Sequence, residues 1–191
     1  GIHRGKGPDE LSLEEIEVLV EAFAGAALRA QACGFDGVEI HGANTYLISQ
    51  FLSPLTNHRN DRYGGDLEGR LRFPLEVLRR VREEVGGEFP VHVRMVAHQY
   101  TDGGLGLEDG KAIARRLEEG GATALHVIAG SPAAPYWHTP PMAVPRGCHA
   151  ELAGEIKKTV GIPVIAVGRI NDPLLAEQIL EEGKADLIAM G

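Results

Sequence analysis

The feature of this sequence that most constrains its fold is a regular alternation of helix-like and strand-like segments. Apolar residues recur at helical spacing in several long segments, and short apolar or alternating runs lie between them. The expected helices cover about residues 13–33, 71–85, 107–119, 148–160 and 173–183, and the expected strands about residues 37–41, 90–95, 124–128, 163–167 and 186–190. Because parallel strands need long crossover connections, usually helices, this order predicts an α/β fold with a parallel sheet.

Local signals set several of these boundaries. Ser12 followed by Glu15 forms a capping box at the start of the first helix. Asp172 is the expected cap of the last helix, with Pro173 at its first position. Pro74 must either open or kink the second helix, because proline lacks the amide hydrogen of a helix interior.

Two architectures fit the alternation, a doubly wound sheet and a (β/α)8 TIM barrel. The dinucleotide-binding doubly wound fold is less favoured, because no G-x-G-x-x-G motif opens a helix after the first strand. Five strands cannot close an eight-stranded barrel, and Gly191 ends the sequence at a strand tip. We therefore expect residues 1–191 to be the C-terminal five β/α units of a TIM barrel, with the first three strands and the final helix missing.

The charge balance favours a small-molecule substrate over a nucleic acid. The chain has 19 Lys and Arg against 27 Asp and Glu, a formal net charge of −8, which phosphates repel. No apolar run approaches the roughly 18 residues that span a bilayer, and the first residues lack the core of a signal peptide. We expect a cytoplasmic protein with no membrane partner.

Side-chain alternation along the strands predicts a polar barrel interior. In the second expected strand, Val91, Val93 and Met95 share one face, which should meet the helices, while His92 and Arg94 share the other. The same counting over neighbouring strands gives the expected interior set Glu39, His41, His92, Arg94 and His126. Burying such groups without partners costs several kcal/mol each, so polar partners are expected among them.

Two of these residues lie at the carboxyl ends of their strands, where barrel enzymes build their active sites. For His41, the alternative is a histidine hydrogen-bonded to neighbouring backbone, and for Arg94 it is an ion pair with Glu39. For His92 and His126, which sit deeper, the structural interpretation is favoured over a functional one.

Glycines mark the tips of the last two expected strands. Gly168 precedes Arg169, and Gly191 follows the final strand. Glycine lets backbone N–H groups approach an anion, and the loops after the last two strands of a barrel are a recurrent phosphate site. Together with an inward arginine, these glycines suggest a phosphorylated cofactor.

A long irregular segment carries a family resemblance. From Gly34 to Pro54, and onward through Asn57-x-Arg-x-Asp61 and Tyr63-Gly-Gly65, the sequence closely resembles the old yellow enzyme family of flavin-dependent ene-reductases. The later motifs 144–147 (VPRG) and 167–173 (VGRINDP) look like the branch that contains 2,4-dienoyl-CoA reductase, 2-enoate reductase and trimethylamine dehydrogenase. The resemblance implies FMN as cofactor, NADH or NADPH as reductant and, in a longer parent protein, an iron–sulfur cluster and FAD.

The resemblance also assigns roles to individual residues. His41 and Asn44 match the pair that hydrogen-bonds the carbonyl or nitro oxygen of the substrate, and Tyr46 matches the proton donor. Arg94 matches the arginine beside the pyrimidine edge of the flavin. The positions that match the phosphate loops are Gly168, Arg169 and Gly191.

The match has departures and unassigned members. Dienoyl-CoA reductases carry an extra catalytic histidine where alignment places Ala133, and this departure argues against a dienoyl-CoA reductase. His126 receives no role from the family. Four further matching residues are interpreted as loop-bracing ion pairs, namely Arg59, Asp61, Arg70 and Arg72.

Two rival hypotheses remain. A barrel metallohydrolase could use Glu39, His41 and His92, although no H-x-H spacing occurs on any strand, and our interpretation assigns no metal. Alternatively, the chain is an inactive folding or assembly unit, a partial barrel completed by another chain or by self-association through its open edge.

Overall fold

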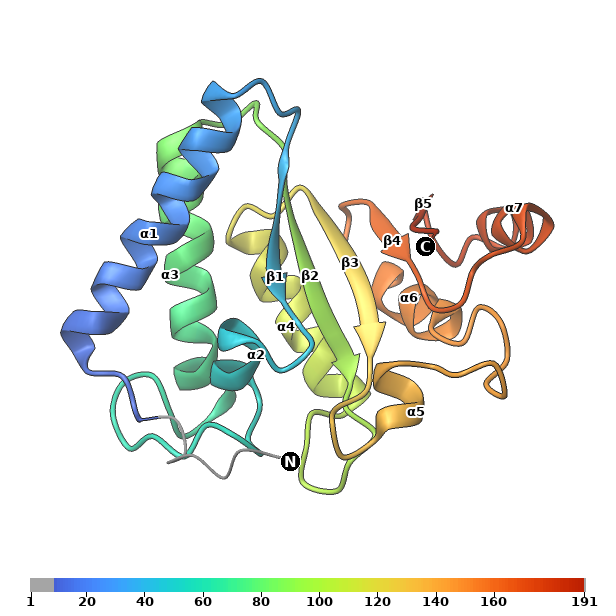
Figure 1. Ribbon diagram of the computed structural model, residues 1–191, viewed down its shortest axis with the longest axis horizontal. Helices are drawn as coiled ribbons and strands as arrows, with labels where there is room; N and C mark the ends of the chain where they lie inside the picture. The colour runs from blue at the N-terminus through green and yellow to red at the C-terminus, as the bar shows by residue number, and fades with distance from the viewer. Residues whose placement is uncertain (1–8, 191) are drawn as a thin grey trace, which may run out of the picture.

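The computed structural model describes residues 9–190 and confirms the alternating α/β order (Figure 1). Gly191, one of the predicted phosphate-loop residues, lies outside the described residues. The helices are α1 (Leu13–Ala32), α2 (Leu47–Leu52), α3 (Leu67–Val85), α4 (Leu107–Glu119), α5 (Pro135–His138), α6 (Ala150–Lys157) and α7 (Pro173–Glu181). The strands are β1 (Val38–Gly42), β2 (Val91–His98), β3 (Ala124–Ala129), β4 (Val164–Ala166) and β5 (Leu187–Ile188).

The sheet is one wall of a barrel. Its strands lie in the order β1-β2-β3-β4-β5, and each pairs in parallel with the next strand along the chain. A doubly wound sheet would reverse its strand order at a switch point, whereas a barrel keeps sequential order. The fold is therefore a partial TIM barrel, and within residues 9–190 the strands β1 and β5 each have one neighbour. Completion of the barrel by another chain stays a prediction.

The outer face of the sheet is apolar and covered by helices, as the strand alternation predicts. Val91, Val93 and Met95 of β2 are at most 3% exposed and share a core with Ile113 and Leu117 of α4. Helix α1 packs outside α3, and α4 and α6 lie against the sheet (Figure 1). This packing leaves the opposite face of the strands free to carry polar side chains.

The predicted capping signals hold. The Ser12 amide donates to Glu15 Oε2 at 2.7 Å and the Glu15 amide donates to Ser12 Oγ at 3.2 Å, which completes the capping box. Asp172 Oδ1 accepts from the Leu174 amide at 3.0 Å. Pro74 lies inside α3 and does not open it; Asp66 caps that helix instead.

Two short helices lie outside the helices and strands that the sequence predicts. Helix α2 occupies part of the 42–66 segment, and α5 is a single turn within the 130–147 segment. Neither has a side-chain hydrogen bond at its cap, and both are too short to display helical periodicity. Burial of Ile48, Phe51 and Leu52 against the core fixes α2, so tertiary packing rather than local preference forms it.

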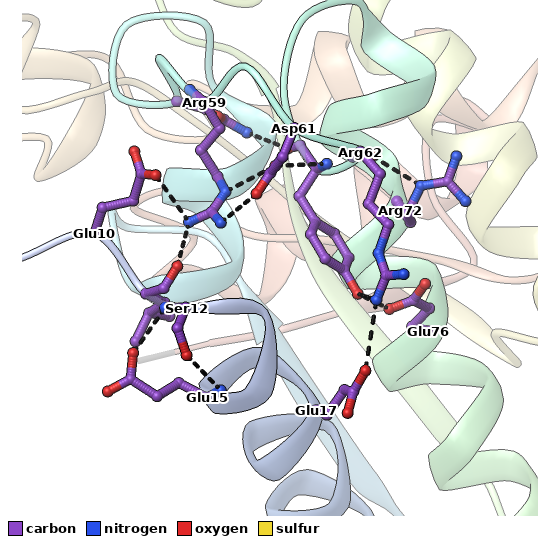
Figure 2. A network of polar contacts seen from close by, with 12 residues as sticks. Glu10, Ser12, Glu15, Glu17, Arg59, Asp61, Arg62, Arg72 and Glu76 are labelled. Carbon is purple, nitrogen blue, oxygen red and sulfur yellow. Dashed lines mark hydrogen bonds and ion pairs between the residues drawn. The ribbon is translucent and has the colours of Figure 1, made fainter.

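A polar network ties the loop after α2 to the start of α1 (Figure 2). The Arg59 side chain, 8% exposed, donates through Nε to Asp61 Oδ1 at 3.1 Å and through Nη1 to the Leu11 carbonyl at 2.8 Å. Next to it, the Tyr63 hydroxyl donates to Glu76 Oε2 at 2.9 Å. The loop is long and polar, and this network satisfies its groups.

The predicted bracing role is confirmed for Arg59 and Asp61 but needs correction for the other two residues. Arg70 donates to the carbonyls of Leu52 and Gly65, and Arg72 Nε donates to a loop carbonyl at 2.8 Å. Both therefore hold backbone carbonyl groups of α2 and of the loop instead of the expected carboxylate partners.

In the stretch from residue 9 to residue 190, no helix is both long enough and apolar enough to cross a membrane.

The Arg59–Asp61 pair predicts a pH-dependent part of the stability. The hydrogen bond from Arg59 lowers the pKa of Asp61. The stabilisation by this ion pair is therefore fully present above the pKa of Asp61 in the unfolded chain, which is about 4. It is lost as the pH falls through the lower pKa of Asp61 in the folded protein. We expect Asp61→Asn to reduce the free energy of unfolding by about 1 kcal/mol at neutral pH, with the deficit shrinking near pH 2. Urea unfolding at both pH values measures this, and an equal deficit at both would contradict the assignment.

Candidate active site

Three polar side chains lie at one level across the inner face of the sheet. Strand pairing places His41 of β1 opposite Arg94 of β2, and Arg94 opposite His126 of β3. His126 is 4% exposed and the Arg94 side chain is 31% exposed. The predicted polar interior is therefore present, with three of its members in one row.

Glu39 lies two residues before His41 on β1, and its side chain reaches the row formed by His41, Arg94 and His126. Its Oε1 is 2.9 Å from Arg94 Nε, and its Oε2 is 2.7 Å from His126 Nδ1. The alternative predicted for Arg94, an ion pair with Glu39, is thus present. An ion pair does not exclude a ligand-facing role, because guanidinium has five N–H donors and this contact uses one.

The ionisation of Glu39 follows from these contacts. Burial alone would raise the pKa of Glu39, but the hydrogen bond to His126, with the charges of His126 and Arg94, outweighs it and lowers the pKa. Glu39 is therefore a carboxylate at neutral pH, with only acceptor atoms.

The His41 side chain is neutral and can donate a hydrogen bond. Burial first, and then the positive charge of Arg94, lowers its pKa below the usual histidine value. Its Nδ1 accepts from the Ala43 amide at 3.3 Å, so the ring proton resides on Nε2. The backbone-bonded alternative predicted for His41 is thus present, and it fixes the tautomer that leaves Nε2–H available.

A tight turn after β1 carries the other two predicted substrate residues. The Tyr46 amide donates to the Ala43 carbonyl at 3.1 Å, and the residues between them, Asn44 and Thr45, have φ of 52° and 57°. Two consecutive positive φ values are typical of a type I′ turn, which suits asparagine but strains β-branched threonine. The turn brings the Tyr46 ring edge-on to His41, with centroids 4.9 Å apart.

Strained backbone conformations occur at the carboxyl end of the sheet. Within residues 9–190, the non-glycine residues with positive φ are Asn44, Thr45, Tyr100 and Arg169. All four follow the carboxyl ends of strands: the first two follow β1, Tyr100 follows β2 and Arg169 follows β4. Strain of this kind persists where the surrounding structure holds it, and it clusters at functional sites.

The predicted phosphate loop follows β4. Gly168 has φ of 111° and Arg169 has φ of 53°. A Cβ at Gly168 would lie 2.9 Å from the His149 ring and 3.1 Å from Cys148 Sγ, so only glycine fits there. The Arg169 side chain binds the backbone of the protein itself, since its Nη1 donates to the Val144 carbonyl.

Two features of this region were missed by sequence reasoning. His149 is 3% exposed, and its Nε2 is 3.0 Å from the Trp137 carbonyl, which joins the two loops. His98, Tyr100 and Trp137 stack in a column, with successive centroids 4.2 Å and 4.4 Å apart. Both depend on contacts between distant segments, and the only sequence signal was the aromatic content of the 130–147 loop.

The residues present fit a flavin mononucleotide. Asn44 Oδ1 and His126 Nε2 are buried atoms without a hydrogen-bond partner, and a polar ligand at the inner face could pair with them. Arg94 supplies a fixed positive charge, and the glycine at 168 lets backbone approach an anion.

The residues of the metallohydrolase hypothesis are not gathered into a metal site. In the described part of the chain, no three His, Cys, Asp or Glu side chains form a group that could hold a metal ion. Glu39 instead makes its contacts with Arg94 and His126.

Residues 3–191 match the family model of the NADH:flavin oxidoreductase / NADH oxidase family. The chain belongs to this family, as its old-yellow-enzyme-like motifs predict. Membership supports a flavin and a nicotinamide reductant for the protein.

Among particular relatives, the chain is 49% identical over 191 residues to an NADH oxidase of Thermoanaerobacter brockii, covering 98% of this chain and 29% of that protein. It is 43% identical over 188 residues to an NADPH dehydrogenase of Bacillus pumilus, covering 98% and 54%. Its fold resembles morphinone reductase in complex with tetrahydroNAD, with a TM-score of 0.76 and 33% identity over 100% of this chain and 49% of that one. The chain thus spans about a third to a half of these relatives.

The packing at Gly168 yields a stability prediction. Gly168→Ala should lower the free energy of unfolding by about 2 kcal/mol, because the backbone becomes strained and the new methyl group meets His149. Gly183→Ala is the matched control, since φ there is 69° and a methyl group added at this position would meet nothing within 4 Å; it should lose about 1 kcal/mol. Equal losses in urea unfolding would show that His149 does not restrict Gly168.

Proposed function

We propose that this chain forms the substrate-facing part of an FMN-dependent NAD(P)H oxidoreductase that reduces the C=C bond of an activated alkene, such as an enone or enoate. The observation that carries the proposal is the grouping of His41, Asn44 and Tyr46 on one strand end and its turn, beside Arg94 on the next strand. Family membership supplies the flavin-linked chemistry.

His41 and Asn44 bind the electron-withdrawing group of the substrate. The Nε2–H of neutral His41 and the side-chain amide of Asn44 are donors, and a carbonyl or nitro oxygen is an acceptor. Hydrogen bonds to this oxygen strengthen as negative charge develops on it, so they stabilise the transition state more than the bound substrate.

Tyr46 donates the proton to the α-carbon of the alkene. Its side chain is 60% exposed and its ring contacts His41, so the hydroxyl belongs to the same open site as the oxygen-binding pair. Bound FMN, once reduced by NADH or NADPH, would supply the hydride that adds to the β-carbon. Proton and hydride together saturate the double bond.

The cofactor is held by charge and by backbone. When FMN is bound, Arg94 would lie beside the flavin ring, and the N–H groups around Gly168 and Arg169, together with Gly191, would bind its phosphate. An iron–sulfur cluster and FAD belong to this proposal only for a longer parent protein, and the substrate is a small molecule in either case.

Titration of the purified protein with FMN, followed by flavin fluorescence, tests the cofactor assignment. We expect saturable quenching, and about tenfold or greater weakening in Arg94→Ala, because a charge-assisted contact is lost. The matched control is Arg80→Ala, which removes an arginine whose partners are Glu21 and Glu84 on the outer helices. Absence of binding by the wild-type protein, or equal weakening in both variants, would contradict the proposal.

The proton-donor role predicts a selective kinetic defect. In the flavin-loaded protein, Tyr46→Phe should slow oxidation by an activated alkene by about 100-fold or more while leaving reduction by NAD(P)H unchanged. Stopped-flow absorbance separates the two half-reactions. Slowing of both to the same extent would point to a general disturbance of the site and would exclude this role.

A further inference from the structure

The inner face of the sheet holds a three-residue network whose purpose the proposed reaction leaves open. Glu39 on β1 contacts Arg94 on β2 and His126 on β3, which lies 87 residues away in the sequence. His126 is 4% exposed, while the Glu39 side chain is 30% exposed. A carboxylate in such a place weakens the positive field of Arg94, so its presence needs a reason.

The hydrogen-bond directions in the network are fixed by chemistry. Ionised Glu39 has only acceptors, so the N–H at His126 Nδ1 donates to its Oε2 at 2.7 Å. That nitrogen then has no lone pair for Arg94 Nε, which lies 3.3 Å away. Arg94 Nε instead forms an ion pair with Glu39 Oε1 at 2.9 Å.

This arrangement orients Arg94. A guanidinium is planar and rigid, so the ion pair with Glu39 at Nε also sets the direction of both terminal nitrogens. Within residues 9–190 these terminal nitrogens have no hydrogen-bond partner, and they remain available to a ligand. His126 fixes the carboxylate, and the carboxylate fixes the arginine.

We propose that Glu39 is a positioning residue for Arg94 and that its negative charge lowers the reduction potential of the bound flavin, with His126 holding the carboxylate in place. The inference rests on the proposed function. Reduction of FMN by two electrons and one proton, delivered as hydride, leaves a negative charge on the flavin that Arg94 stabilises. Glu39 offsets part of that stabilisation by Coulomb repulsion, and so keeps the reduced flavin a stronger hydride donor.

The test separates charge from position with two variants of Glu39. Glu39→Gln keeps a polar side chain of the same shape between Arg94 and His126 but removes the charge, and Glu39→Met removes the polar group as well. In the FMN-loaded protein, we expect Glu39→Gln to increase the reduced-to-oxidised ratio at a given potential by about tenfold, a rise of about 30 mV for a two-electron couple. The matched control is Glu84→Gln, which removes a carboxylate from the outer ion pair with Arg80 and should leave the potential unchanged.

A second readout needs no flavin. Solvent exchange of the Arg94 Nε–H, followed by nitrogen-15 NMR, should stay slow in the wild-type protein and in Glu39→Gln, and should become at least tenfold faster in Glu39→Met. Unchanged exchange in Glu39→Met would overturn the positioning role. An equal or lower potential in Glu39→Gln would overturn the charge effect. Failure of the wild-type protein to bind FMN would overturn the proposed function, and this inference with it.

Discussion

The side-chain alternation of parallel strands is the constraint on which the rest of this structure depends. Strand β2 buries Val91, Val93 and Met95 against the helices, and the same backbone must then present Arg94 to the other face. A wall that is apolar outside can thus hold ionisable groups inside. Those groups need polar partners, and the contacts of Glu39 with Arg94 and His126 supply some of them, while the buried His126 Nε2 has no partner within residues 9–190.

The site combines this rigid wall with strained connections. The left-handed residues after β1, β2 and β4 lie directly beyond hydrogen-bonded strands, so the packed sheet stabilises conformations that the loops alone would avoid. The turn through Asn44 and Thr45 brings the Tyr46 ring against His41 without a flexible linker. Positions set in this way vary little, which suits chemistry that depends on small distances.

Most of the fold follows from local patterns, but part of the site does not. Periodicity and end signals predict long helices such as α1 and α4, whereas α2 exists because Ile48 and Phe51 pack into the core. Motif resemblance selects His41, Asn44 and Tyr46, and the structure groups them. It gives no role to His126, because the partner that explains it is 87 residues away on another strand. Alternation predicts which face a residue occupies, but not which acceptor it finds there.

The imidazole of His149 has a consequence for how such sequences can diverge. One side of the ring packs against Gly168, and its Nε2 is bonded to the Trp137 carbonyl, so the 130–147 loop and the loop after β4 share one side chain. A side chain at 168 would meet this ring and would also be strained by the positive φ of the backbone, so a smaller residue at 149 alone does not make room for one. Substitution of His149 itself would disturb the contacts of both loops at once.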